Sequence, residues 1–129
     1  MDVSQLKRVP LFSDVPEESL KKIALFTKVD EFAEGRPLMQ EGGYSNDFFV
    51  IEEGTAKVER DGEQVADLGP GDVVGEEGLL EGTQRSATVT ATSTVRVIKI
   101  EHWELSRMKK SMPEVVERLQ QLVEQRQSD

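Results

Sequence analysis

The sequence predicts a mainly β fold with flanking helices, and three observations support this prediction. Short runs rich in apolar and β-branched residues recur through the middle of the chain, with turn residues between them. A segment with helical spacing precedes these runs, and two further helical segments come after them. Regularly spaced short strands of this kind are typical of a sandwich or a barrel.

Length, charge and cysteine content limit the function classes. The 129 residues are enough for one domain with a buried core. There is no cysteine, so the sequence predicts neither disulfides nor thiolate metal sites. The net charge of −9 argues against a general nucleic-acid surface, because phosphate backbones attract basic stripes. A small anion held by local groups is compatible with this charge.

The sequence also bears on localisation. The first residues, MDVSQLKRVP, contain no apolar run, so we expect no secretory signal. No stretch approaches the roughly 20 apolar residues that span a bilayer. We therefore expect a soluble cytoplasmic protein without a membrane partner.

The first expected element is a helix within a lead-in that ends near residue 28. Pro16 is predicted at the first helical position, where a missing backbone N–H costs nothing. Leu11 and Phe12 precede this helix and should dock it on the later segments of the domain. The apolar residues at near-helical spacing are Leu20, Ile23, Ala24 and Phe26.

Strands are expected from residue 29 to residue 100. Asp61-Gly62 is the strongest short-range hairpin signal, and Val65 and Leu68 should face inward on the return strand. Residues 69–72 read as a turn. The expected strand segments are 29–32, 37–40, 48–52, 55–60, 63–68, 86–92 and 94–100.

Two helices are expected after the strands, over 101–129. The first should run to Lys110, and Trp103 should pack it against the strands. Pro113 should start the second helix, with Ser111 as its N-cap. This helix either packs its apolar stripe on the strands or pairs it with a second copy. The stripe consists of Val115, Val116, Leu119, Leu122 and Val123.

Residues 75–91 carry the strongest functional signal and read GEEGLLEGTQRSATVTA. Gly75 and Gly78 lack a Cβ, so the backbone there can approach a ligand closely. The residues after Gly75 have helical spacing, and the first N–H groups of a helix favour an anion. Arg85 can offer a planar fork of donors to two phosphate oxygens.

A carboxylate completes this constellation. Glu76 can only accept hydrogen bonds when ionised, and a ribose 2′-hydroxyl needs an acceptor. Ser86 can add a hydroxyl contact to phosphate or base. The segment therefore predicts a site for a phosphorylated ribose. The alternative is that Glu76 and Arg85 form a surface salt bridge, which contributes little to stability. In that case Gly75 and Gly78 are ordinary turn residues.

Three stretches resemble the cyclic nucleotide-binding domain family, the module of bacterial cAMP-receptor transcription factors, kinase regulatory subunits and cyclic-nucleotide-gated channels. The resemblance runs from about Leu11 to the last helix. The stretches are Glu41-Gly42 with FFVIEEG at 48–54, LGPGDVVGE at 68–76, and GEEGLLEGTQRSATV at 75–89.

The resemblance implies a double-stranded β-helix, which is a jelly-roll-like barrel, with an N-terminal helix and two C-terminal helices. It implies one cyclic nucleotide-binding domain over residues 1–129. The implied parts are a helical lead-in over 1–28, a barrel over 29–100 that contains a phosphate-binding cassette at 75–89, and helices over 101–129.

The resemblance also implies a ligand and roles for the site residues. Family members bind ribose through the Glu and phosphate through the Arg, and the next residue helps to read the base, so these roles fall to Glu76, Arg85 and Ser86. We expect cAMP as the ligand, with cGMP still open, and no cofactor. The predicted ligand-binding residues are Leu68, Gly75, Glu76, Glu77, Gly78, Arg85, Ser86 and Ala87.

Two departures from the family pattern matter. Glu77 stands where an apolar residue is usual and adds a carboxylate beside an anion site, while Gln84 stands where many members have proline. The last helix also offers no aromatic residue to cap a purine. These departures keep a second hypothesis open, in which the domain binds no nucleotide and serves as a protein-interaction module.

We expect no enzyme, because the sequence lacks a histidine cluster, a cysteine and a paired nucleophile and base. A ligand would instead shift the population between two arrangements of the terminal helices. The signal would leave through Val116, Leu119 and Val123 to a second copy or a separate effector. No effector segment comes after the sensor in this sequence, so a complete chain would act on another molecule and an excised domain would lack its effector.

Overall fold

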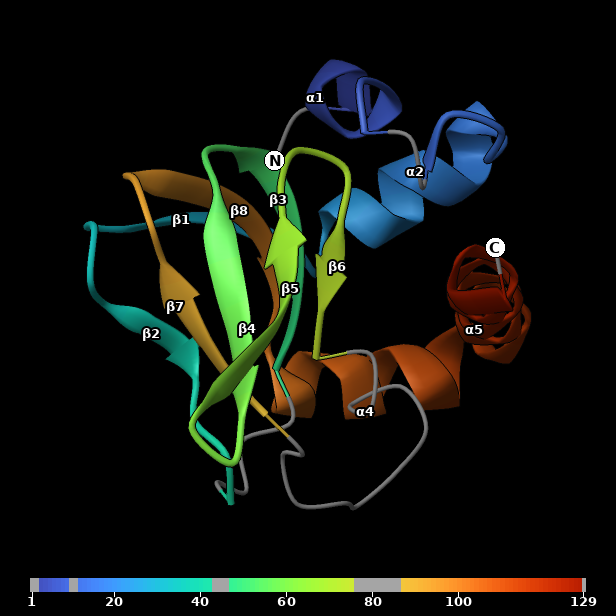
Figure 1. Cartoon of the computed structure of the whole chain (residues 1–129). Helices are drawn as coiled ribbons and strands as arrows, with labels where there is room; N and C mark the ends of the chain where they lie inside the picture. The colour runs from blue at the N-terminus through green and yellow to red at the C-terminus, as the bar shows by residue number, and fades with distance from the viewer. Residues whose placement is uncertain (1–2, 10–11, 43–46, 76–86, 129) are drawn as a thin grey trace.

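The computed structural model confirms the predicted fold class (Figure 1). It describes residues 3–9, 12–42, 47–75 and 87–128. The described helices are α1 (Val3–Lys7), α2 (Glu17–Ala24), α4 (His102–Ser111) and α5 (Pro113–Ser128). The described strands are β1 (Lys28–Phe32), β2 (Pro37–Met39), β3 (Phe48–Glu53), β4 (Ala56–Arg60), β5 (Glu63–Leu68), β6 (Val73–Val74), β7 (Thr88–Ala91) and β8 (Val95–Ile100).

These strands form two four-stranded antiparallel sheets. The first sheet has the order β1-β8-β3-β6, and the second has the order β2-β7-β4-β5. Among the described residues no hydrogen-bonded strand pair joins one sheet to the other. The jelly-roll-like fold is therefore built here as two sheets and not as a closed barrel.

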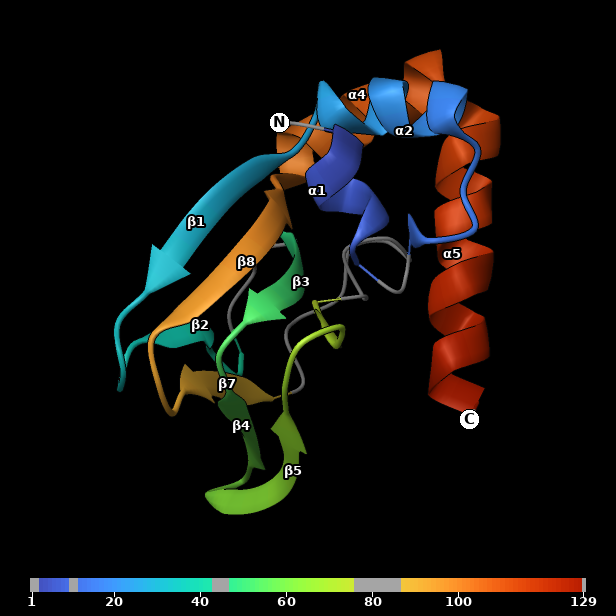
Figure 2. The ribbon, with the colours of Figure 1, turned by 90° about the horizontal axis from the view of Figure 1, so that it is seen from above.

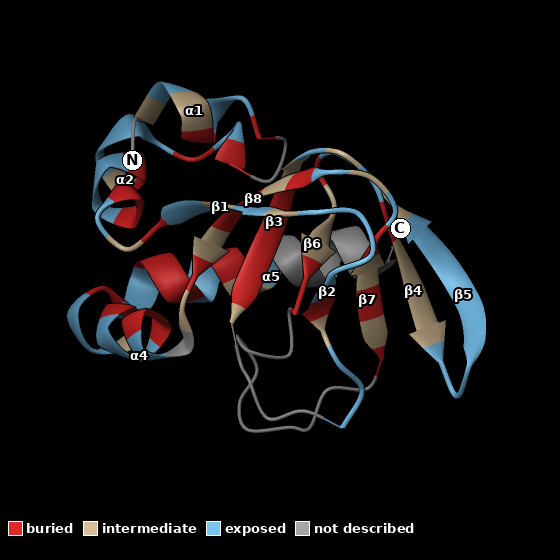
Figure 3. Ribbon diagram, turned by 90° about the vertical axis from the view of Figure 1, so that its left-hand side faces the viewer, coloured by how far each residue is buried: buried red, intermediate tan, exposed pale blue. Residues whose placement is uncertain are grey.

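Strand β3 is buried on both faces, as its apolar run predicts. Alternate side chains of a strand point to opposite faces, so Phe48 and Val50 join one core while Phe49 and Ile51 join another. All four side chains are at most 4% exposed. In Figure 3 the mostly red strand β3 contrasts with the pale blue, exposed strand β5.

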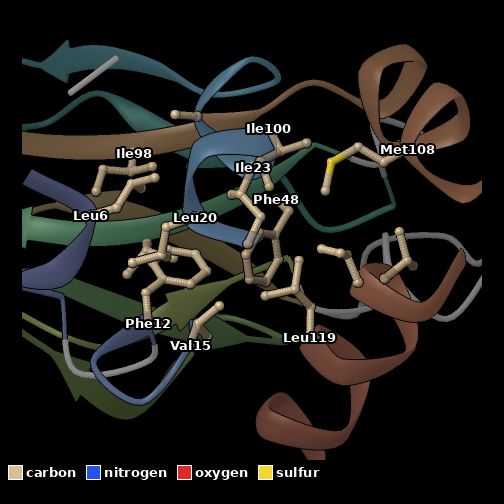
Figure 4. Packing of buried hydrophobic residues seen from close by; sticks show 14 of the residues in the cluster. Leu6, Phe12, Val15, Leu20, Ile23, Phe48, Ile98, Ile100, Met108 and Leu119 are labelled. Atoms are coloured by element: carbon tan, nitrogen blue, oxygen red, sulfur yellow. The ribbon is translucent and has the colours of Figure 1, made fainter. Parts of the chain in front are cut away.

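The first core joins all four described helices to the first sheet (Figure 4). Leu6 of α1 and Phe12 are fully buried, so the predicted docking by Phe12 is confirmed. Figure 2 shows α2 and α4 gathered beside the start of β1. The other labelled members are Val15, Leu20, Ile23, Phe48, Ile98, Ile100, Met108 and Leu119.

The second core lies among the strands. Phe49 of β3 packs edge-on against Phe32 of β1, with ring centroids 5.9 Å apart. Val89 of β7 and Val97 of β8 bring both sheets into this cluster. The other buried members are Leu38, Ile51, Ala56, Val74, Ala91 and Val95.

The predicted hairpin is confirmed, but one inward residue is not. Asp61 and Gly62 have φ values of 54° and 80°, which suit a two-residue turn of type I′. Val65 was expected inward and is instead 52% exposed. A register shift causes this: Val58 pairs with Ala66 and the next residue pairs with Gln64, so Val65 is left between them.

Two helix starts also differ from the prediction. Pro16 lies one residue before the helix, in the N-cap position of α2, with an extended ψ of 144°. Ser111 is the last residue of α4 and not an N-cap, because its Oγ donates to the Arg107 carbonyl oxygen at 2.8 Å. Met112 separates α4 from α5, and Pro113 begins α5 as predicted.

The C-terminal helices pack inward. Val115, Val116 and Leu119 are buried in the first core, so the described part of the α5 stripe packs within the chain. Trp103 of α4 contacts the edge strand of the first sheet: Lys28 of β1 lies 5.7 Å from its ring centroid, and the residue stays 44% exposed.

Replacing Gly54 with alanine should destabilise the protein by about 2–5 kcal/mol, the sum of a left-handed backbone and a steric clash. Its φ is +93°, and a Cβ there would collide with the Thr94 carbonyl oxygen and lie 2.9 Å from the Val95 Cα. Gly62→Ala is the matched control, because its φ is +80° but nothing lies within 4 Å. Urea unfolding should show about 1–2 kcal/mol for the control, and equal losses would contradict the close approach.

The Lys28–Glu101 pair should stabilise the fold only between acid and alkaline limits. Its 2.8 Å contact lowers the pKa of Glu101 from 4.5 and raises the pKa of Lys28 from 10.5. The stabilisation is therefore lost as pH falls through the folded-state pKa of Glu101, and as pH rises through that of Lys28. The effect of Lys28→Gln on the free energy of unfolding should be largest between these limits. In a Glu101→Gln background the part of this effect that changes with pH at the acid limit should vanish.

Candidate functional site

The predicted cassette segment is anchored on both sheets. Gly75, with φ +78°, follows β6 of the first sheet, and Ala87, which is 2% exposed, precedes β7 of the second sheet. The two sheets therefore hold the two ends of residues 76–86. The predicted site residues Glu76, Glu77, Gly78, Arg85 and Ser86 lie outside the described residues.

The anchor before Gly75 is a short strand fixed by β3. Val73 and Val74 of β6 pair with Val50 and Phe49 of β3. The turn before β6 is held by the same strand, since the Gly71 N–H donates to the Ile51 carbonyl oxygen at 2.8 Å. The backbone entering Gly75 is therefore fixed by the central strand of the first sheet.

The anchor after Ala87 is held from two sides. Thr88 and Val89 of β7 pair with β4. The Glu41 N–H donates to the Thr88 Oγ1 at 3.0 Å, and the Glu41 Oε1 accepts from the Asp61 N–H at 3.0 Å. Glu41 therefore ties the end of β2, the hairpin turn and the start of β7 together. The sequence marked Glu41 only as part of a motif, and this positioning role was missed.

An apolar surface lies on the second sheet near these anchors. Leu68 ends β5 directly opposite Ala56, and it packs, partly buried, against the second core. Val58 of β4 and Met39 of β2 are also partly buried and pack against the second core. Ligand sites are lined mainly by apolar side chains of this kind. Val58 and Met39 were not among the predicted site residues.

A separate cavity of about 330 Å³ is lined by Arg8 and Val9, residues 51–53 of β3, and Pro70-Gly71. Leu68, Gly75 and Ala87, the predicted site residues that the structure describes, are not among the residues that line it. Pro70-Gly71 precedes β6 and Gly75 follows it, so the cavity and Gly75 lie at opposite ends of this strand.

Neither a metal site nor a membrane span is found among the described residues. In the parts of the chain that the structure describes, no group of three His, Cys, Asp or Glu residues is placed to hold a metal ion. No helix in those parts is long and apolar enough to cross a membrane.

Comparison with protein families and curated proteins gives a consistent result. A family model described as "Cyclic nucleotide-binding domain" matches residues 29–111, which is more than half of the chain. The cAMP-dependent protein kinase regulatory subunit of Hypocrea atroviridis is 35% identical over 92 residues, covering 71% of this chain and 20% of that protein. The regulatory subunit of Yarrowia lipolytica is 36% identical over 94 residues. The chain spans about a quarter or less of the length of these relatives.

Solved structures share the fold. The N-terminal domain of a transcriptional regulator from Streptomyces coelicolor matches with TM-score 0.78 and 30% identity, covering 98% of this chain and 91% of that one. A cyclic nucleotide-binding protein from Geobacter metallireducens has TM-score 0.85, 23% identity, and coverage of 95% and 92%. The regulatory subunit of a cAMP-independent protein kinase A from Trypanosoma brucei has TM-score 0.83 and 20% identity, covering 98% of this chain and 44% of that one.

Proposed function

This chain belongs to the cyclic nucleotide-binding domain family, and from that premise we propose that it binds a cyclic mononucleotide and reports occupancy to another protein. The match over residues 29–111 carries this proposal, because it includes both anchors of the cassette segment. We propose cAMP in preference to cGMP as the ligand, and a cytoplasmic regulatory module without catalysis of its own. The curated relatives, which are cAMP-dependent protein kinase regulatory subunits, support this choice of ligand.

In the proposed complex, different residues bind the phosphate and the ribose of the ligand. Arg85 pairs with the two free oxygens of the cyclic phosphate, and Glu76 accepts from the ribose 2′-hydroxyl. The positions of Gly75 and Ala87 support this assignment, because these two residues flank the segment that contains Glu76 and Arg85 and each adjoins a strand of a different sheet. The base would lie toward the apolar side chains of Leu68 and Val58.

The proposed signal is a separation of α5 from the other helices. In the described conformation Val116 and Leu119 are buried, and the Arg118 guanidinium donates to the Asp14 carbonyl oxygen at 3.1 Å. The described stripe is therefore closed to a second copy of the chain. A ligand that favours the separated arrangement would expose this stripe to a homodimer partner or to a separate effector.

A second candidate function is a protein-interaction module that binds no cyclic nucleotide. The structural similarity to a regulatory subunit described as cAMP-independent favours it at the level of the fold. Glu77 also supports it, because a second carboxylate would repel a phosphate.

A thermal-shift scan with cAMP, cGMP, cyclic dinucleotides, AMP and ATP tests the proposal. A ligand at about 100 times its dissociation constant should stabilise the protein by about 2.7 kcal/mol. Arg85→Ala should then weaken cAMP binding by about 1.5–3 kcal/mol, the contribution of a hydrogen bond to a charged group. Arg36→Ala, an exposed arginine in the turn before β2, is the control and should bind as wild type does. Stabilisation by none of these nucleotides would favour the interaction module, and equal cAMP binding in Arg85→Ala would remove Arg85 from the phosphate.

Glu76→Gln should lower the preference for ribose over 2′-deoxyribose ligands. The neutral amide accepts a weaker hydrogen bond than a carboxylate, and a loss of about 1 kcal/mol corresponds to about fivefold in affinity. Calorimetry with cAMP and 2′-deoxy-cAMP gives this ratio for wild type and variant. An unchanged ratio would show that Glu76 does not contact the 2′-hydroxyl.

A further inference from the structure

The cavity at the far end of β6 has the features of a binding site. Pro70 lines it and is exposed, so its ring forms an apolar floor, while Val9 and Ile51 line it at 3% and 0% exposure. Charged groups surround that floor: Arg8 is exposed, and the Glu53 side chain is 68% exposed. Its volume of about 330 Å³ suits a small molecule.

A buried carboxylate oxygen beside this cavity lacks a donor. Glu52 lines the cavity, and its Oε1 accepts from the Arg96 Nη1 at 3.3 Å. Its Oε2 is shielded from solvent and has no hydrogen-bond partner within the described structure. A buried acceptor without a donor costs about 1–3 kcal/mol. Because the terminal torsion of a glutamate is broad, this oxygen can turn toward a donor in the cavity.

The charges around the cavity favour a cation. Arg96 lies 3.6, 3.3 and 3.8 Å from carboxylate oxygens of Glu31, Glu52 and Glu53. Arg8 also lines the cavity, so the described cluster of three carboxylates and two guanidinium groups has a net charge of −1. One positive charge would neutralise it.

We propose that this cavity binds a small organic monocation with a guanidinium head. The head donates to Glu52, and the apolar body of the ligand lies against the ring of Pro70. A guanidinium suits this position because its planar donors match a carboxylate and it is weakly hydrated, which lowers the desolvation cost. The site is distinct from the proposed nucleotide site, since the hairpin turn near Ala87 and the turn near α1 lie at opposite ends of the molecule (Figure 1).

The test uses butylguanidinium and its neutral isostere butylurea on the whole chain, followed by NMR of the backbone amides. Butylguanidinium should shift the Ile51 and Gly71 amide signals saturably, and butylurea should not. Glu52→Gln should weaken binding about tenfold or more, since a charge-assisted bond is lost. Glu31→Gln is the matched control, because it also removes a carboxylate from Arg96 but does not line the cavity, and it should weaken binding less than Glu52→Gln does, since the net charge changes but no contact with the ligand is lost.

Four outcomes would overturn the proposal. An equal response to butylurea would show that charge is not recognised, and unchanged binding in Glu52→Gln would show that this carboxylate is not the acceptor. A response that appears only in Arg8→Ala would assign the cavity to the guanidinium of Arg8 itself. If the amide signals of wild type and of every variant do not respond to butylguanidinium, the cavity is not a binding site for it. A well-dispersed NMR spectrum of Glu52→Gln would show that a loss of binding does not come from misfolding. Glu52→Asp is a second variant that retains the charge.

Discussion

The structure depends on one strand that is buried on both faces. Strand β3 lies inside the first sheet, paired with β8 on one side and β6 on the other. Phe48 and Val50 belong to the core that holds the helices, while Phe49 and Ile51 belong to the core among the strands. Interiors pack as densely as organic crystals, so the two cores cannot move independently while they share this strand. The position of every described helix and of both cassette anchors depends on β3.

The sequence predicted correctly those features that depend on residues close together in the chain. The run Phe48–Ile51 is apolar without alternation, which is the pattern of a strand covered on both faces. Asp61-Gly62 predicted the hairpin because both residues tolerate positive φ. The errors concern features that depend on how neighbouring strands or helices are arranged. The inward position of Val65 failed because a register shift between strands has no sequence signature, and Ser111 failed as an N-cap because Met112 separates the two helices.

Three of the predicted site residues are described, and their role in binding stays a prediction. Leu68 ends β5, Gly75 follows β6 and Ala87 precedes β7, so they lie at the ends of strands from both sheets. The Glu41 contacts with Thr88 and Asp61 could not be read from the sequence, because they join residues 47 and 20 positions apart. Such contacts depend on the completed fold. The roles of Glu76 and Arg85 rest on the family motif and on the chemistry of carboxylate and guanidinium groups.

Strand β6 lies between residues of the two proposed sites. It has two residues, so its ends are separated by about 7 Å of backbone. The Gly71 turn at one end is fixed to Ile51, and both residues line the cavity. The Gly75 turn at the other end leads into the cassette. A displacement of Ile51 would therefore act on both turns through backbone pairing alone, and a coupling between the two sites needs no longer path than the hydrogen bonds between β3 and β6.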